Sequence, residues 1–226
     1  MTTRTQPDST TSAYPRRWLA LALLGTAQFM LILDVTVVAI ALPLMEADLG
    51  LSREAVTWVV AAYTVTFGGL MIFGGRLADL FGSRAIVYVG LSLFIIGSLL
   101  CGLADSGQML LSGRVGQGVG AALLSPAALS VVVRLFEGQE RNRALGIWSA
   151  LGGGGAAIGV LLGGLIAAGP GWPWVFFVNV PVGLVILLAL VALLPAMPRA
   201  EDGRARLDVL GAVLVTAATA SLIYGL

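Results

Sequence analysis

The sequence predicts an all-α membrane protein that crosses the bilayer six times and begins a seventh crossing. Of its 226 residues, 58% are hydrophobic and only 11% are charged, whereas soluble domains carry about 25% charged residues. Apolar stretches of about 20 residues, the length that a helix needs to cross the hydrocarbon core, recur between short polar links. These two observations, with a mean hydropathy of +0.96, predict a bundle of transmembrane helices.

The elements follow in order along the chain. Residues 1–15 are polar and rich in Thr and Ser, so we expect a disordered cytoplasmic N-terminus. Residues 16–195 hold the predicted six-span bundle, with spans at 18–44, 55–75, 85–103, 108–133, 144–168 and 174–194. A polar cytoplasmic linker at 196–208 then precedes the start of an additional transmembrane helix at 209–226.

Arginines indicate how these spans are oriented. If the chain alternates sides, one side of the membrane receives Arg4, Arg16, Arg17, Arg76, Arg84, Arg134, Arg141, Arg143, Arg199, Arg204 and Arg206. The opposite side receives only Arg53, which lies among acidic residues. Because cytoplasmic loops retain positive charge, we expect a multi-pass protein of the plasma (inner) membrane with a cytoplasmic N-terminus.

Missing residue types exclude several classes of function. The chain has no Lys and no His, and its one cysteine, Cys101, lies in an apolar stretch. A phosphate-binding loop needs Lys, a zinc site needs His or several Cys, and a disulfide needs two Cys. A formal charge of +1 gives no basis for nucleic-acid binding. We therefore expect no metal, no cofactor, no nucleic-acid partner and no enzymatic activity; an ion gradient would drive any transport.

Two charged residues lie inside predicted spans. Asp34 is in the first span and is the only carboxylate within any of them, and Arg114 is in the fourth. A charge at a span centre costs at least about 2.5–3.5 kcal/mol, so an intramembrane charge indicates function by default. From the helical rise, Asp34 is about 14 Å and Arg114 about 10 Å below the outer side. The two side chains are therefore expected to share a level.

The chemistry of such a pair suggests a proton switch. Burial favours the protonated form of a carboxylate, whereas a neighbouring guanidinium favours the ionised form. Solvent access or movement of Arg114 would then switch Asp34 between the two forms, which is what a proton-coupled carrier requires. The alternative is a static ion pair that only orders the bundle.

Glycines form a stripe along the fifth span. Gly155, Gly159 and Gly163 recur every four residues, which leaves one helix face without side chains and lets a neighbouring helix approach closely. This spacing fits a helix that slides or bends, and it fits simple tight packing equally well.

A faint internal repeat accompanies the stripe. Gly74, Gly75, Ala78 and Gly82 recur at the same mutual spacing as Gly163, Gly164, Ala167 and Gly171. Each set ends the second span of a three-span group, which predicts two inverted three-helix repeats, the plan of one half of many secondary transporters.

Other polar residues are weaker candidates. In the link between the second and third spans, Gly82 would make the turn and Asp79 would cap a helix N-terminus or pair with Arg84; a solvated turn is the alternative. Candidates for lining a polar cavity within the spans are Gln28, Thr36, Tyr63, Gln117 and Trp148.

Two segments resemble motifs of the major facilitator superfamily. Segment 75–84 resembles its loop signature G-x-L-a-D-r-x-G-r-[kr], and the matching positions are Gly75, Leu77, Ala78, Asp79, Gly82 and Arg84. Segment 111–122 is similar to its fourth-span motif, with Arg114, Gln117 and Gly118 in place. The resemblance implies that Arg114 takes part in proton coupling.

Three further segments narrow the resemblance. Segment 152–164 is similar to a fifth-span antiporter motif, with Val160 in place of its Pro. Segment 33–43 resembles l-D-x-T-v-v-n-v-A-L-P, and segment 172–183 resembles W-r-W-x-F-x-i-N-v-P-x-G. Together the five segments resemble the fourteen-span drug:proton antiporter family of the EmrB/QacA type.

This resemblance implies a function and roles for the candidate residues. It implies export of amphipathic, often cationic small molecules against inward proton flow, by alternating access between two six-helix halves, of which this chain holds the N-terminal one. The missing C-terminal half would be supplied in cis or by a partner chain. Asp34 and Arg114 would couple protons to substrate. The gate would comprise Gly75, Asp79, Gly82 and Arg84, and the fifth span would flex at Gly155, Gly159, Gly163 and Gly164.

Three alternatives stand beside this hypothesis. The chain would be a truncated, non-transporting half or an assembly subunit if no opposing bundle exists, because alternating access needs one. It would be a dedicated exporter if its substrate is one endogenous antibiotic or metabolite. An intramembrane enzyme is disfavoured because no nucleophile–base pair is visible in the sequence.

Overall fold

The computed structural model describes residues 14–195, together with residues 211, 214, 217, 218 and 221. The elements in this part are all helices: α1 (Arg17–Leu49), α2 (Arg53–Phe81), α3 (Ser83–Gly102), α4 (Gly107–Leu135), α5 (Gly138–Ala168), α6 (Pro173–Phe177) and α7 (Asn179–Leu193). The predicted N-terminal segment, except for residues 14 and 15, the linker at 196–208 and most of the predicted helix at 209–226 lie outside the described residues.

The six predicted spans are confirmed as helices long and apolar enough to cross a membrane, with α6 and α7 forming one span. The helices extend beyond several predicted ends because their polar terminal turns are helical too. Helix α2, for example, begins at Arg53, where the Ser52 hydroxyl accepts a hydrogen bond of 3.2 Å from the Ala55 amide and satisfies a backbone donor of its first turn.

The predicted sixth span at 174–194 is confirmed as one apolar span, Pro173–Leu193. Within this span a single residue, Val178, separates α6 from α7, and its backbone stays in the helical region with φ at −61° and ψ at −30°. Pro181 explains the interruption, since it has no N–H to donate to the carbonyl of Phe177, four residues earlier. Asn179 thereby becomes the first residue of α7.

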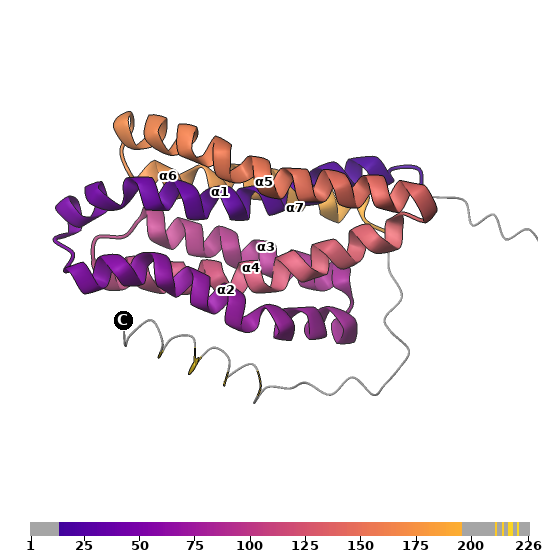
Figure 1. Ribbon diagram of the computed structural model, residues 1–226, viewed down its shortest axis with the longest axis horizontal. Coiled ribbons are helices and arrows are strands. Elements are labelled where there is room, and N and C mark those ends of the chain that lie inside the picture. Colours follow the sequence, from indigo (N-terminus) through magenta and orange to yellow (C-terminus); the bar gives the residue numbers. More distant parts are fainter. Residues whose placement is uncertain (1–13, 196–210, 212–213, 215–216, 219–220, 222–226) are drawn as a thin grey trace, which may run out of the picture.

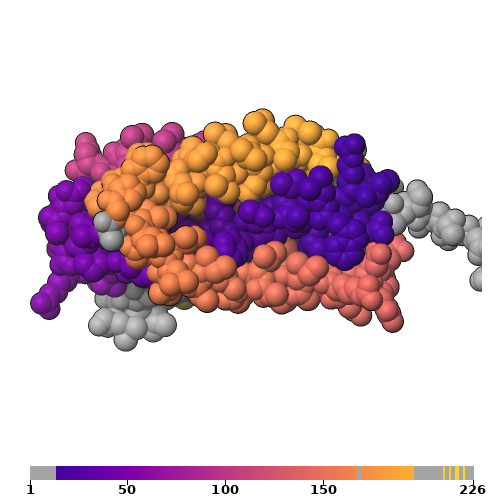
Figure 2. Space-filling model, turned by 90° about the horizontal axis from the view of Figure 1, so that it is seen from above, coloured from indigo at the N-terminus to yellow at the C-terminus, as the bar shows by residue number. Residues whose placement is uncertain are grey.

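The helices form two layers along one long axis, with α1, α5, α6 and α7 on one side and α2, α3 and α4 on the other (Figure 1). Figure 2 shows α1 between α5 and α7 on one face of the bundle. Helix α2 packs along α4, and α5 packs along α1. In two three-helix repeats, α1 corresponds to α4 and α2 corresponds to α5. The contact of α2 with α4 then corresponds to the contact of α5 with α1, which agrees with such repeats.

Hydrogen bonds at the two ends of the bundle confirm that the spans alternate in direction. At one end, Arg17 of α1 pairs with Glu140 of α5 at 3.0 Å, and the hydroxyl of Tyr14 donates to the carbonyl of Leu193 at the end of α7. At the other end, Trp172 donates to the Asp48 carboxylate over 2.9 Å. The first end also holds the α2–α3 and α4–α5 links, so the loop arginines of the described residues gather there, with the exception of Arg53.

Glycines allow α3 and α4 to pack closely enough for their backbones to touch. A Cβ at Gly97 would lie 2.7 Å from the backbone nitrogen of Gln117, and one at Gly120 would lie 2.5 Å from that of Phe94. Such approaches are closer than any side chain allows. This contact places Ser98 of α3 beside Gln117.

Candidate functional site

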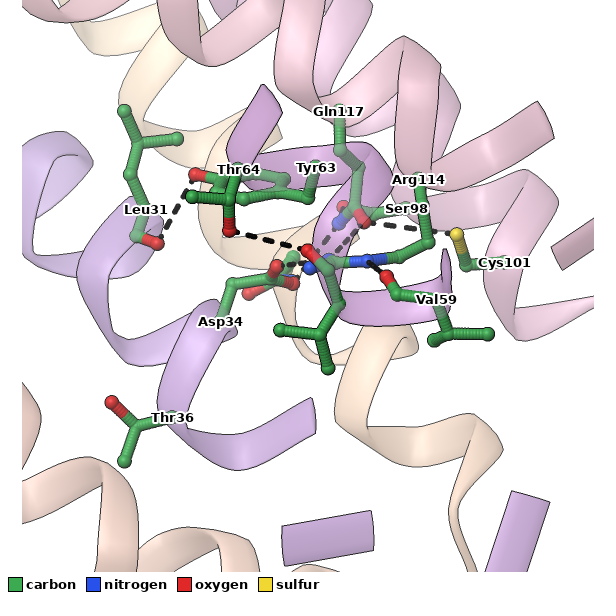
Figure 3. Close-up of polar contacts among 12 residues, drawn as sticks. Leu31, Asp34, Thr36, Val59, Tyr63, Thr64, Ser98, Cys101, Arg114 and Gln117 are labelled. Atoms are coloured by element: carbon green, nitrogen blue, oxygen red, sulfur yellow. Dashed lines mark hydrogen bonds and ion pairs between the residues drawn. The ribbon is translucent and has the colours of Figure 1, made fainter. Parts of the chain in front are cut away.

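The centre of the bundle holds a fully enclosed ion pair between Asp34 of α1 and Arg114 of α4. The Arg114 Nη1 lies 2.5 Å from Asp34 Oδ2, and the two residues are 1% and 0% exposed, respectively. Figure 3 shows the two side chains directed toward each other between the helices. The prediction that they share a level in the membrane is therefore confirmed.

Helix α2 holds the Arg114 guanidinium from a second side. The Nε of Arg114 donates to the carbonyl of Val59 over 3.0 Å. The guanidinium carbon of Arg114 lies over the Tyr63 ring, 4.5 Å from the ring centroid, within the range of a cation–π contact. The Tyr63 hydroxyl in turn donates to the Leu31 carbonyl of α1 over 3.3 Å. The Nη2 of Arg114 has no hydrogen-bond partner among the described residues.

Two carboxamides hold the other carboxylate oxygen. Asp34 Oδ1 accepts hydrogen bonds of 3.0 Å from Gln117 Nε2 of α4 and from Asn179 Nδ2 of α7. Gln117 Nε2 also donates to the Ser98 hydroxyl of α3 over 2.8 Å. Asn179 and Ser98 were not among the residues predicted for the site, although a polar residue within an apolar span was a signal for both.

The hydrogen-bond partners of Asp34 within the described residues are all N–H donors. The carboxylate receives one charged and two neutral N–H donors, and one of its neighbours carries the opposite charge. Moving two charges out of water is costly unless their geometry is good and further hydrogen bonds satisfy them. Here both carboxylate oxygens are satisfied by protein donors, whereas the Nη2 of Arg114 is not paired within the described residues.

The five candidates for lining a cavity have different surroundings. Tyr63 and Gln117 belong to the enclosed cluster, where they are 1% and 0% exposed, respectively. Gln28 has an enclosed side-chain oxygen without a hydrogen-bond partner among the described residues. Thr36 lies at the contact between α1 and α5, and Trp148 is half-buried against the apolar core.

The glycine stripe of α5 faces α1. A Cβ at Gly155 would lie 3.2 Å from Ile32, one at Gly159 would lie 2.8 Å from Thr36 Cβ, and one at Gly163 would lie 3.1 Å from Val37 Cα. Gly164 differs, since a Cβ there would meet nothing within 4 Å. The stripe is thus the surface through which α5 approaches α1, and Gly164 faces away from it.

We expect Gly159→Ala to lower the thermal stability of the purified full-length protein and Gly164→Ala to leave it unchanged or raise it. Both changes replace Gly by Ala inside one helix, so the propensity gain of about 1 kcal/mol is common to both. Only the first methyl group collides with a neighbour, at an expected cost of about 1–3 kcal/mol. Equal unfolding midpoints for the two variants would contradict the observed contact.

The two charged loop residues expected to act in a gate, Asp79 and Arg84, each contact a partner on their own helix. Asp79 lies 3.9 Å from Arg76 on its own helix. The Nε of Arg84 instead donates to the Tyr88 hydroxyl over 2.8 Å. Asp79 therefore neither pairs with Arg84 nor caps α3, which begins without a side-chain cap. Gly82 does make the turn, with φ at 93°, and Gly75 lies beside Pro126 of α4.

Two clefts open along the contact between α2 and α4. One of about 490 Å³ is lined by Glu54, Trp58, Gln108 and neighbouring residues, and one of about 390 Å³ is lined by Met71, Pro126, Arg134 and their neighbours. Neither is lined by Asp34 or Arg114, so the ion pair is separated from both clefts in this conformation.

Several curated proteins resemble this chain. A puromycin resistance protein of Streptomyces alboniger is 46% identical over 212 residues, which cover 93% of this chain and 42% of that protein. A cephamycin export protein of Amycolatopsis lactamdurans is 44% identical over 207 residues, covering 91% of this chain and 43% of that protein. The chain thus spans less than half the length of these relatives.

A solved structure and a family profile agree with this similarity. An inward-facing, occupied structure of a bacterial homologue of the human lysosomal transporter Spinster matches with a TM-score of 0.68 and 26% identity, over 84% of this chain and 47% of that one. The sequence profile of the Major Facilitator Superfamily matches residues 24–224. With its six-span helical bundle, this chain belongs to the Major Facilitator Superfamily.

Proposed function

We propose that this chain is part of a proton-coupled antiporter that exports drugs or other amphipathic small molecules across the plasma membrane. The observation that carries this proposal is the enclosed pair of Asp34 and Arg114, whose atoms lie 2.5 Å apart. Asp34 is the only carboxylate within the predicted spans, so it is the acidic group there that would bind the proton. The function is transport and not catalysis, and the proton gradient takes the place of a cofactor.

An unpaired hydrogen-bond donor in the site supports the proposal that its helices move when Asp34 is protonated. Arg114 retains an N–H group without a partner among the described residues, and an unsatisfied buried donor is costly. Such a donor is available to water, to substrate or to a new protein acceptor once the helices move. When Asp34 takes up a proton, the guanidinium loses its counter-charge and seeks other acceptors, which links protonation to helix movement.

The proposed orientation places the arginine-rich end of the bundle in the cytoplasm. Arg17, Arg84 and Arg141 all lie at that end, and positively charged loops are retained on the cytoplasmic side. The opposing six-helix half, against which this half would rock, comes from the same polypeptide or from a partner chain.

The relatives support the substrate class. Two are named for puromycin resistance and for cephamycin export. Because each name specifies one antibiotic, a dedicated exporter of a single antibiotic or metabolite is the second candidate function. If the following experiment shows no uptake, the chain would instead belong to a non-transporting half or an assembly subunit, or to such a dedicated exporter.

Transport by everted membrane vesicles tests the proposal. Vesicles from cells that produce the native full-length protein should accumulate ethidium or puromycin when the interior is made acidic, and nigericin, which dissipates that gradient, should abolish accumulation. Uptake that survives nigericin would contradict proton coupling. No uptake of either compound, in vesicles that contain the protein, would contradict broad drug export and favour a dedicated exporter or a non-transporting half. A panel of antibiotics then separates these two.

A further inference from the structure

We infer that Asn179 is a positioning residue for the proposed proton step: its carboxamide responds to protonation of Asp34 and transmits that change to the sixth span. This inference rests on the proposed function. Asn179 is 2% exposed, and its Nδ2 donates to Asp34 Oδ1 over 3.0 Å. It is the first residue of α7, directly after Val178. A hydrogen bond thus joins the interruption of the sixth span to the proton-binding carboxylate.

The cluster has no acceptor ready for a protonated Asp34. All three side chains that contact the carboxylate, Arg114, Gln117 and Asn179, do so through N–H donors. A proton arriving from water forms an O–H bond on Asp34, and no electrons are transferred. The new O–H is itself a donor and would face another donor in this arrangement. One neighbour must therefore turn an acceptor toward it.

Arg114 and Gln117 are unable to make that change. A guanidinium has no acceptor. The Gln117 amide is fixed at both ends, since its Nε2 donates to Asp34 and Ser98. Its Oε1 accepts from Arg114 Nη1 over 2.8 Å and from the Cys101 thiol over 3.7 Å. Rotating this amide would turn its N–H groups toward the Arg114 donor and lose several hydrogen bonds at once.

Asn179 is free of this constraint. Within the described residues its carboxamide makes one side-chain hydrogen bond, to Asp34. A half-turn about its Cβ–Cγ bond exchanges the nitrogen and oxygen. Asn179 then accepts a hydrogen bond from the protonated carboxyl, whereas it donates one to the ionised carboxylate. Protonation at Oδ1, the oxygen that Arg114 does not hold, requires the least rearrangement.

The position of Asn179 in the chain explains why rotation of its carboxamide would affect the backbone of the sixth span. Pro181 leaves the Phe177 carbonyl without its usual helical donor, so the backbone here lacks a bond that would otherwise resist bending. Helix α7 is held at its far end by a hydrogen bond from Tyr88 to Leu190 of 3.0 Å. A change at Asn179 is therefore expected to tilt α6 against α7.

Other titratable and charged groups near Asp34 are few. Helix α4 contributes Arg114, α2 contributes Tyr63, whose ring lies against that guanidinium, and α3 contributes Cys101, which contacts Gln117. Helix α7 contributes the neutral Asn179, and α5 approaches α1 through glycines. Asn179 is thus a neutral partner whose removal changes the environment of Asp34 without changing the charge of the cluster.

Infrared titration of the purified native full-length protein tests the assignment. The band of the protonated Asp34 carboxyl is identified by its loss in Asp34→Asn, and its intensity is followed against pH. In Asn179→Leu, we expect the midpoint of protonation to rise by about one pH unit, the effect of losing one hydrogen bond to a charged group. Val180→Ala, a change of packing beside Asn179, serves as the control and should leave the midpoint unchanged.

A second variant covers the case in which Asn179→Leu fails to fold. Asn179→Asp keeps the shape of the side chain but places a second carboxyl beside Asp34, so the two should share one proton. The expected midpoint is higher than in the native protein by more than one pH unit. A folded variant of either kind with the native midpoint would overturn the inference. A purely structural Asn179 would lower the unfolding temperature without moving the band.

The two proposals fail separately. If the midpoint shifts in Asn179→Leu but native vesicles show no uptake sensitive to nigericin, proton-driven export is wrong and Asn179 still sets the protonation of Asp34. If native vesicles transport but the midpoint stays fixed in the folded variant, export stands and the role of Asn179 is wrong. Under both proposals together, the pH profile of ethidium uptake moves in the same direction as the infrared band.

Discussion

We expect Asp34→Asn to abolish proton-driven uptake in everted vesicles and to leave the protein inserted in the membrane. The side chain is the only carboxylate within the predicted spans, and a carboxamide does not exchange a proton near neutral pH. The measurement is ethidium accumulation under an imposed gradient, divided by the amount of protein in the same vesicles. Glu46→Gln is the matched control, because Glu46 is an exposed carboxylate on the same helix, and it should retain native uptake.

Stability must be measured alongside transport in Asp34→Asn. An Asn at this position has one oxygen and one NH₂ group, but both Asp34 oxygens accept hydrogen bonds. In either orientation, the NH₂ group meets a donor, and Arg114 loses its counter-charge. We therefore expect a lower unfolding temperature with normal insertion. Undiminished uptake per molecule would refute the assignment of Asp34 as the proton-binding group.

The fold was predictable because lipid restricts a chain to few structures. A span in hydrocarbon must satisfy its own backbone groups, so each apolar stretch of the right length becomes a helix. Short links then force neighbouring spans to alternate in direction. The sixth span was predicted in the same way, and the one-residue break between α6 and α7 within it lies where Pro181 removes a helical hydrogen bond.

The core of the site was predictable from depth alone. Two charges at one level of a dry bundle have strong reason to pair, and Asp34 and Arg114 do so. Asn179 and Ser98 were not found because composition fixes neither the rotation of a helix about its axis nor the distance between two helices. The approach of α3 to α4 at Gly97, which brings Ser98 to Gln117, is a tertiary result.

The loop between α2 and α3 shows the same limit. Asp79 and Arg84 are five residues apart on either side of Gly82, and bringing them together needs a particular turn. Each finds a nearer partner on its own helix, since Arg76 is three residues from Asp79 and Tyr88 is four residues from Arg84. Pairs at this spacing face each other on a helix, so the local contacts form here in preference to the one across the turn.

Arg114→Met is expected to destabilise the protein by about 3–5 kcal/mol, because it leaves the Asp34 charge buried without its partner. The change also removes the hydrogen bonds to the Val59 carbonyl and to Gln117 Oε1. Arg114→Lys should recover only part of the loss, since an ammonium group cannot reproduce the planar set of guanidinium donors. Unfolding of the full-length protein in mixed micelles measures all three stabilities.

The double change Asp34→Leu with Arg114→Met distinguishes a pair that stabilises the bundle from one that serves transport. Removing both members of a buried ion pair often costs little, because the desolvation of both charges is avoided as well. We therefore expect the double variant to be more stable than Arg114→Met alone, with a coupling free energy of about 1–3 kcal/mol, yet inactive in vesicles. A double variant as unstable as the sum of its single changes would show that the two side chains act independently. One that is stable and still transports would make the pair a static element of the fold, because nothing in proton coupling would then depend on it.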